Sequence, residues 1–270
     1  MSEQNISVIV PVFNEERTVA SVVRSLIKLE SGFELIFVND GSTDNSQGVL
    51  EKFTDRIKLI NLKRNHGKGF ALAVGVKRAR GKIIVFLDAD LVNLKPEHIE
   101  KIVMPLLINE AQVVITSISS TSGLFDPLTS FSGQRAYFKK DLWPYLEQMS
   151  KTRYGIEVYL NKILRKKKTK KIKLKDISYV LKRQKMDSSL LPSVYLKEAL
   201  DIARTIAQIN GMSPKKAKTV YNRKKIRSLK DLLKMISESE DMKDLKEVKR
   251  YINSYLAKHF NFRNNDENSY

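Results

Sequence analysis

Residues 83–90 read Ile-Ile-Val-Phe-Leu-Asp-Ala-Asp, an unbroken apolar run that ends in two carboxylates. Such a run is typical of a strand that is buried on both faces, as in a parallel sheet covered by helices on either side. Residues 6–12 (ISVIVPV) have a similar character. In sheets of this kind ligands bind beyond the carboxyl ends of the strands, so Asp88 and Asp90 are expected at a binding edge.

Apolar strands alternate with amphipathic helices through the first 120 residues. The strands are expected at residues 6–12, 35–38, 57–62, 83–87 and 112–117. The helices between them repeat apolar side chains at helical spacing and are expected at residues 19–27, 43–53, 67–79 and 96–107. This alternation predicts an α/β fold with a mostly parallel sheet and helices on both of its faces.

The chain has a formal net charge of +19. Its positive charge is concentrated in the second half. Residues 1–150 carry 18 basic and 17 acidic side chains, whereas residues 151–270 carry 31 basic and 13 acidic ones. We expect an α/β domain over residues 1–186 and a basic all-α extension over residues 187–270. A basic segment attracts nucleic acid or an anionic membrane surface, although a lysine-rich solvated surface has the same composition.

Several classes of protein are excluded by composition. The chain has no cysteine, which excludes a disulfide scaffold, a thiolate zinc site and a cysteine nucleophile. No apolar run approaches the roughly 18 residues that a membrane-spanning helix needs. The first residues carry no basic leader before their apolar stretch, unlike a signal peptide. We therefore expect a cytoplasmic protein.

Carboxylates follow three of the predicted strands. Asp88 and Asp90 are hard oxygen ligands, which suit Mg²⁺ or Mn²⁺ bridged to a diphosphate, although a solvated turn has the same sequence. Asp40 ends the second strand, where it can accept a hydrogen bond from a nucleobase or a sugar hydroxyl, or belong to an ordinary turn. Glu15 has the same two interpretations, because acidic side chains also favour the first turn of a helix.

A glycine-rich turn, Asn-His-Gly-Lys-Gly at residues 65–69, precedes the third predicted helix. Its glycines allow close approach of the backbone to a ligand, and its amides and Lys68 could face a phosphate. The turn is not a P-loop, because no Ser or Thr follows the lysine at the required place. No G-x-G-x-x-G follows the first strand, which argues against a nicotinamide or flavin site.

Four segments together carry a resemblance to a known family: VPVFNEE (10–16), VNDGSTDNS (38–46), NHGKGFAL (65–72) and FLDAD (86–90). Their order and spacing resemble family 2 glycosyltransferases, in particular the branch of polyprenyl-phosphate mannosyl- and glucosyltransferases. The resemblance covers roughly residues 5–185 and continues through FSGQRA (131–136) and YGIE (154–157). It implies the A-type glycosyltransferase fold and a nucleotide-diphosphate sugar as donor.

The resemblance also implies roles for individual residues in donor binding. Pro11, Glu15 and Asp40 would hold the nucleoside. Lys68 would lie near the base or the phosphates.

Two carboxylates would serve the metal, which would be Mg²⁺ or Mn²⁺. Asp88 would meet the ribose or the metal, and Asp90 would be the main metal ligand. The metal would neutralise charge on the departing diphosphate. Related sequences often carry a histidine near the end of the catalytic domain that can complete the metal site, and Tyr179 stands in that position here.

The acceptor side is assigned to two further residues. Glu157 is the candidate for binding or activating the acceptor, with a helix N-terminal acid as the alternative. Arg135 could bind a phosphate in a bidentate manner, or could be an ordinary ion-pair partner.

The C-terminal extension resembles a helix-hairpin-helix motif around residues 205–235. Such hairpins bind nucleic-acid phosphates through backbone amides, but Ser213 stands where the pattern has its second glycine. A protein-binding or structural helical pair is the alternative. The basic segments 165–175 and 215–227 could instead contact anionic lipid.

Two functions therefore remain open from the sequence. The first is a metal-dependent glycosyltransferase that moves a sugar from a nucleotide-diphosphate donor to a lipid-phosphate, small phosphorylated or hydroxyl acceptor, such as polyprenyl phosphate, at the cytoplasmic membrane face. The second is a nucleic-acid-associated protein whose basic C-terminal domain binds DNA or RNA and whose transferase domain is a modifying or degenerate module.

Overall fold

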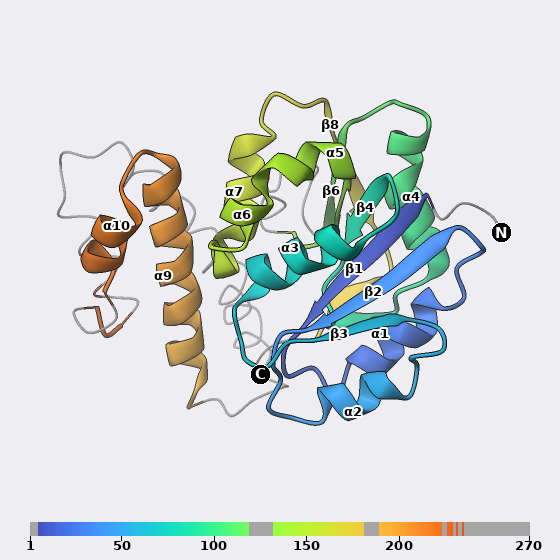
Figure 1. The fold of residues 1–270 in the computed structure, drawn as a ribbon, viewed down its shortest axis with the longest axis horizontal. Helices are drawn as coiled ribbons and strands as arrows, with labels where there is room; N and C mark the ends of the chain where they lie inside the picture. Colours follow the sequence, from blue (N-terminus) through green and yellow to red (C-terminus); the bar gives the residue numbers. More distant parts are fainter. Residues whose placement is uncertain are drawn as a thin grey trace, which may run out of the picture.

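The computed structural model describes residues 5–118, 132–180, 189–222, 226–228, 231 and 234. Within these residues seven strands form one sheet in the order β3-β2-β1-β4-β7-β6-β8 (Figure 1). The strands are β1 (Ile6–Val12), β2 (Phe33–Asn39), β3 (Lys58–Asn61), β4 (Ile83–Phe86), β6 (Val113–Ile118), β7 (Arg135–Phe138) and β8 (Thr169–Leu174).

The predicted mostly parallel sheet is confirmed. β1 pairs in parallel with β2 and with β4, β2 pairs in parallel with β3, and β6 pairs in parallel with β8. β7 runs antiparallel between β4 and β6. A second, two-stranded sheet pairs β5 (Leu91–Val92) with β9 (Ser178–Tyr179).

Helices cover both faces of the sheet. The described helices are α1 (Val19–Leu26), α2 (Ser46–Glu51), α3 (Lys68–Arg78), α4 (Pro96–Leu107), α5 (Lys139–Leu142), α6 (Leu146–Met149), α7 (Ile156–Ile163), α9 (Leu191–Ile209) and α10 (Pro214–Val220), with 3-10 turns η2 (Trp143–Tyr145) and η3 (Arg153–Gly155). Alternate side chains of β1 enter different cores, because Val8 and Val10 pack with α1 and α4 whereas Ile9 packs with α3 and α7.

Part of the basic run at residues 166–175 is the edge strand β8. From its sequence this run was expected to be a charged surface segment, and no strand was predicted there. Lysines on an edge strand discourage the addition of a further strand from another molecule. The charge and the strand are therefore compatible.

Helix α9 packs directly against the α/β part of the chain. Val158 of α7 lies in one buried cluster with side chains of α9, and Ala217 of α10 completes it from the other side. Figure 1 shows α9 beside α7, with α10 on its far side. The predicted domain boundary at residue 186 lies outside the described residues.

The turn between α9 and α10 contains Gly211, whose φ of +99° is in the left-handed region. The side chain of Ser213 caps α10 by accepting a hydrogen bond from the N–H of Lys216. Much of the rest of the predicted helix-hairpin-helix lies outside the described residues, and nucleic-acid binding remains a prediction.

Among the described residues, none of the helices combines the length and the apolar character needed to cross a bilayer.

Candidate functional site

Asp40 follows β2 and is almost completely buried, with 3% of its surface exposed. Its two carboxylate oxygens accept hydrogen bonds from the N–H of His66 at 2.9 Å and from the N–H of Gly67 at 2.7 Å. Burial raises the pKa of Asp40, and these two N–H donors oppose that rise. In this structure Asp40 therefore anchors the turn at residues 65–67 that leads into α3. Its predicted contact with the nucleoside remains a prediction.

Gly67 is required where it stands in this turn. Its φ is +101°, and a Cβ at this position would meet the side chain of Arg153. A residue with a side chain would therefore be strained in its backbone and would displace Arg153.

Lys68, the first residue of α3, joins two carboxylates from distant segments. Its Nζ lies 2.6 Å from Oδ1 of Asp88 and 2.7 Å from Oε1 of Glu157. Burial alone would lower the pKa of Lys68, but the two carboxylates more than offset this effect, so the pKa lies above its ordinary value. Lys68 is therefore charged at neutral pH. It faces Asp88 and Glu157 in this structure rather than open space at the donor edge.

The second oxygen of Asp88 is held by Gln134. Nε2 of Gln134 donates to Oδ2 of Asp88 at 2.8 Å, and Oε1 of Gln134 accepts from the Tyr179 hydroxyl at 2.7 Å. A Cβ on Gly133 would overlap the Asp88 carboxylate, which shows how closely this segment approaches β4. The sequence analysis quoted Gln134 within FSGQRA but gave it no role. Its contact with Asp88 could not be inferred from spacing alone.

Tyr179 lies close to the two acidic residues of the sheet edge. β9 pairs with β5 so that Tyr179 is opposite Leu91, and the N–H of Val180 donates to the carbonyl of Asp90 at 3.0 Å. Burial raises the pKa of Tyr179, and the charges of Asp88 and Asp90 raise it further. The phenol therefore stays neutral, and a neutral phenol is a poor replacement for a histidine ligand.

The donor set fits a hard divalent cation with few protein ligands. No group of three or more His, Asp or Glu side chains that could hold a metal was found in the described part of the chain. Both oxygens of Asp88 are engaged by Lys68 and Gln134. Asp90 as the main metal ligand remains a prediction. Mg²⁺ and Mn²⁺ accept one or two carboxylates and take their other ligands from water and diphosphate oxygens.

Replacing Tyr179 with phenylalanine tests this view of the metal site. We expect the free energy of unfolding to fall by about 1 kcal/mol, because a buried hydrogen bond to Gln134 is lost. The affinity for Mn²⁺ in the presence of UDP should not change, because a neutral phenol is not a ligand. Urea denaturation and a Mn²⁺ titration measure the two effects. A tenfold loss of Mn²⁺ affinity would instead identify Tyr179 as a ligand.

Glu15 lies in the segment between β1 and α1. Its carboxylate accepts from the hydroxyl of Thr18 at 2.7 Å, and its N–H donates to the hydroxyl of Ser46 at 2.7 Å. Pro11, on β1, is in register with Val38 of β2. Pro11 and Glu15 therefore lie at or just after the carboxyl end of β1, next to the carboxyl end of β2, which Asp40 follows.

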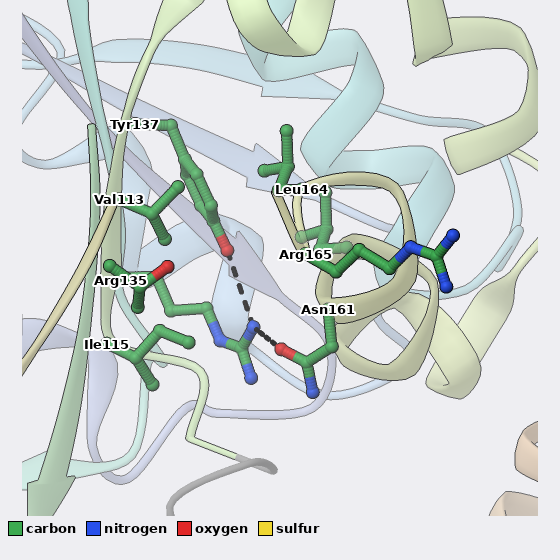
Figure 2. A pocket seen from close by; sticks show the side chains of 9 residues that line it. Val113, Ile115, Arg135, Tyr137, Asn161, Leu164 and Arg165 are labelled. Atoms are coloured by element: carbon green, nitrogen blue, oxygen red, sulfur yellow. Dashed lines mark hydrogen bonds between the residues drawn. The ribbon is translucent and has the colours of Figure 1, made fainter. Parts of the chain in front are cut away.

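Arg135 is the more deeply buried residue of the predicted acceptor pair, since Glu157 is 8% exposed. It starts β7 with 1% of its surface exposed. Its Nε donates to the carbonyl of Ser132 at 2.6 Å, and its Nη1 donates to Oδ1 of Asn161 at 2.7 Å. Figure 2 shows the guanidinium pointing toward Asn161 in a pocket between the sheet and α7. Asn161 lies one helical turn after Glu157. Arg135 therefore contacts α7 one turn beyond the residue that pairs with Lys68. Its predicted phosphate contact remains a prediction.

With the geometry described, comparison with known proteins identifies the family. The family model described as Glycosyl transferase family 2 matches residues 7–173. The chain belongs to glycosyl transferase family 2. This confirms the family that the motifs at residues 10–16, 38–46, 65–72 and 86–90 predicted.

Curated relatives match this family 2 chain over part of their length. An undecaprenyl-phosphate 4-deoxy-4-formamido-L-arabinose transferase of Proteus mirabilis is 40% identical over 106 residues, which are 36% of this chain and 32% of the relative. A dodecaprenyl-phosphate galacturonate synthase of Rhizobium johnstonii is 33% identical over 118 residues, which are 41% of this chain and 35% of the relative. The match thus spans about a third of each relative.

A solved structure of the same fold is glucosyl-3-phosphoglycerate synthase from Mycobacterium tuberculosis in complex with Mn²⁺, UDP and glucosyl-3-phosphoglycerate. It is 22% identical to this chain with a TM-score of 0.60, and the match covers 78% of this chain and 81% of the other. The likeness confirms the A-type glycosyltransferase fold that the sequence predicted.

Proposed function

We propose that this family 2 chain transfers a sugar from a nucleotide-diphosphate donor to a lipid phosphate such as polyprenyl phosphate. The observation that carries the proposal is the acidic edge of the sheet, where Lys68 joins Asp88 to Glu157 next to Asp90. The relatives from Proteus mirabilis and Rhizobium johnstonii, named for undecaprenyl and dodecaprenyl phosphate, support this class of acceptor.

On the donor side, Asp90 would hold Mg²⁺ or Mn²⁺, assisted by Asp88. When bound, the metal supplies Lewis-acid stabilisation of the diphosphate leaving group. Pro11, Glu15 and Asp40 would bound the nucleoside pocket along the ends of β1 and β2. The Mn²⁺ and UDP in the Mycobacterium tuberculosis neighbour support this combination of ligands.

On the acceptor side, a phosphate needs no general base, because it is already anionic and its oxygen can attack the anomeric carbon directly. The ion pair with Lys68 at 2.7 Å keeps Glu157 in a fixed place. This fits a role for Glu157 in orienting the acceptor rather than removing its proton. Arg135 of β7 donates to Asn161, which lies one turn of α7 after Glu157. It is the proposed contact for the acceptor phosphate.

The basic C-terminal part would bring this site to an anionic membrane surface. Lys215, Lys216 and Lys218 of α10 are exposed. Each basic side chain near such a surface contributes roughly 1 kcal/mol to binding. A peripheral contact of this kind would place the acceptor lipid within reach of the enzyme.

A donor screen tests the proposal. The thermal midpoint of the full chain is measured with UDP-, GDP- and other nucleotide sugars, with and without Mn²⁺. The true donor at a hundred times its Kd should stabilise the fold by about 2.7 kcal/mol. Transfer to undecaprenyl phosphate in detergent is then followed with that donor in labelled form. Absence of stabilisation by any nucleotide sugar with either metal contradicts the proposal.

A further inference from the structure

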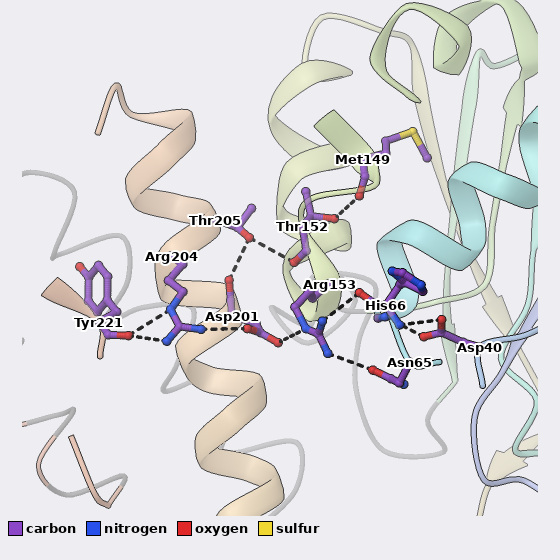
Figure 3. A network of polar contacts seen from close by, with 11 residues as sticks. Asp40, Asn65, His66, Met149, Thr152, Arg153, Asp201, Arg204, Thr205 and Tyr221 are labelled. Carbon is purple, nitrogen blue, oxygen red and sulfur yellow. Dashed lines mark hydrogen bonds and ion pairs between the residues drawn. The ribbon is translucent and has the colours of Figure 1, made fainter. Parts of the chain in front are cut away.

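Arg153 hydrogen-bonds to the turn at residues 65–67, which is called the donor-side turn below. It lies in η3 with a left-handed φ of +49°. Its Nη1 donates to the carbonyl of His66 at 3.0 Å, and its Nη2 donates to Oδ1 of Asn65 at 2.9 Å (Figure 3). Asp40 holds the N–H groups of the same turn from inside. The turn at residues 65–67 is therefore fixed between a carboxylate and a guanidinium.

Arg153 is itself held by helix α9. Its Nε lies 3.5 Å from Oδ2 of Asp201, a residue with 4% of its surface exposed. The other oxygen of Asp201 lies 3.4 Å from Nη1 of Arg204, whose guanidinium also donates to the carbonyl of Tyr221. Figure 3 shows this chain of contacts running from Tyr221 through Asp201 and Arg153 to the donor-side turn.

A second polar contact joins α9 to η3, between Glu198 and Tyr154. The hydroxyl of Tyr154 hydrogen-bonds to Glu198, which is 1% exposed and lies one turn before Asp201. The carboxylate of Glu198 is the main cause of a raised pKa of Tyr154, and the charges of Glu15 and Asp90 contribute to the rise.

The approach of α9 to η3 is close at a third position. Oγ1 of Thr205 donates to the carbonyl of Asp201 in its own helix at 2.9 Å and lies 3.4 Å from the carbonyl oxygen of Thr152. A Cβ on Gly155 would overlap the Thr205 side chain. Three turns of α9 therefore face η3 with polar side chains, where a helix serving only as packing would present apolar ones.

We propose that helix α9 is a positioning element of the donor site: Asp201 orients Arg153, which holds the turn at residues 65–67 for donor binding. The inference rests on the proposed donor binding. The family match ends at residue 173, so α9 lies beyond the part of the chain that the family model covers. Buried carboxylates are costly unless they are paired. Asp201 and Glu198 are both buried, and both are paired with residues of η3.

Hydrogen exchange of the full chain without ligand tests the first half of this inference. In the variant Asp201→Asn, amides of the peptide spanning residues 63–70 should exchange about fivefold faster than in the wild type, because Arg153 loses its charged partner. The matched control is Arg204→Gln, which removes the other ion pair of Asp201 and the contact with Tyr221 but leaves Arg153 paired. It should leave exchange in residues 63–70 unchanged.

Affinity for UDP in the presence of Mn²⁺ tests whether the turn held by Arg153 serves donor binding. Asp201→Asn should raise the Kd for UDP about fivefold, and Arg204→Gln should not. Arg153→Gln reaches the same turn from the other end and should give the same two effects. The double variant should be no worse than either single one, because both remove one linkage. Circular dichroism confirms that each variant is folded.

The outcomes separate this inference from the proposed function. Wild-type exchange in residues 63–70 in folded Asp201→Asn overturns the inference, whatever the donor is. Uniformly faster exchange across α10 and the sheet, or additive effects of the two variants, overturns it as well by showing a merely structural role. Failure of wild-type protein to bind any nucleotide contradicts the proposed function and leaves the exchange result to decide the coupling.

Discussion

Replacing Lys68 with methionine is expected to lower the free energy of unfolding by about 3 kcal/mol at pH 8. The ammonium lies between Asp88 and Glu157, and the three side chains are only 18%, 22% and 10% exposed. Removing one member of a buried ionic group leaves the others without compensation, which typically costs about 3–5 kcal/mol. The partial exposure of these side chains to solvent favours the lower end of that range.

The pH dependence of the same variant has a definite sign. In the wild type the pKa of Lys68 is raised, so its contribution to stability is complete below the ordinary lysine pKa and is lost only as the pH rises through the higher folded value. In Lys68→Met, two carboxylates face each other, and one can take up a proton as the pH falls. The difference from wild type should therefore be smaller at pH 5 than at pH 8.

Urea denaturation at the two pH values measures both effects. Lys151→Met is the matched control, because it removes an ion pair with Glu147 whose side chains are 61% and 75% exposed. Exposed pairs of this kind contribute little to stability, so the loss should be much smaller than in Lys68→Met. Equal losses in the two variants, or a loss from Lys68→Met that does not depend on pH, would contradict the assigned role of Lys68.

The strands that carry the site could be predicted because each is a continuous apolar run followed by a polar turn. Residues 6–12 were predicted and observed as β1, and residues 83–87 were observed as β4 one residue shorter. β7 and β8 were missed for physical reasons. β7 has only four residues, and the alternation of lysine with isoleucine and leucine in β8 was masked by the high density of charge.

The site residues could be named from the sequence, but their partners could not. The motifs pointed to Lys68, Asp88 and Glu157 separately, yet packing of α3, β4 and α7 decides that one ammonium joins the two acids. The role of α9 did leave a signal. Glu198 and Asp201 stand three residues apart on an otherwise apolar helical face, a pattern that indicates buried polar partners. Nothing in the spacing identifies Arg153 as that partner.

Replacing Asp90 with asparagine is expected to reduce donor turnover by about a thousandfold while leaving the fold intact. The change keeps the size of the side chain and removes the charge that would bind the metal. Loss of one main electrostatic contact to a departing group costs roughly a factor of 10²–10³ in catalysis, and weaker metal binding adds to this. Turnover with Mn²⁺ and with Mg²⁺, measured beside a urea denaturation curve, separates activity from stability.

The comparison with Asp88→Asn distinguishes the two acids of the sheet edge. Asp88 accepts from Lys68 and Gln134, so its replacement should lower the free energy of unfolding as well as the activity. Asp90→Asn should lower the activity and the Mn²⁺ affinity. If Asp90→Asn turns over donor at the wild-type rate, Asp90 is not the metal ligand. The charge on the leaving diphosphate would then be neutralised without Asp90, for example by Lys68, whose Nζ lies 2.6 Å from Asp88.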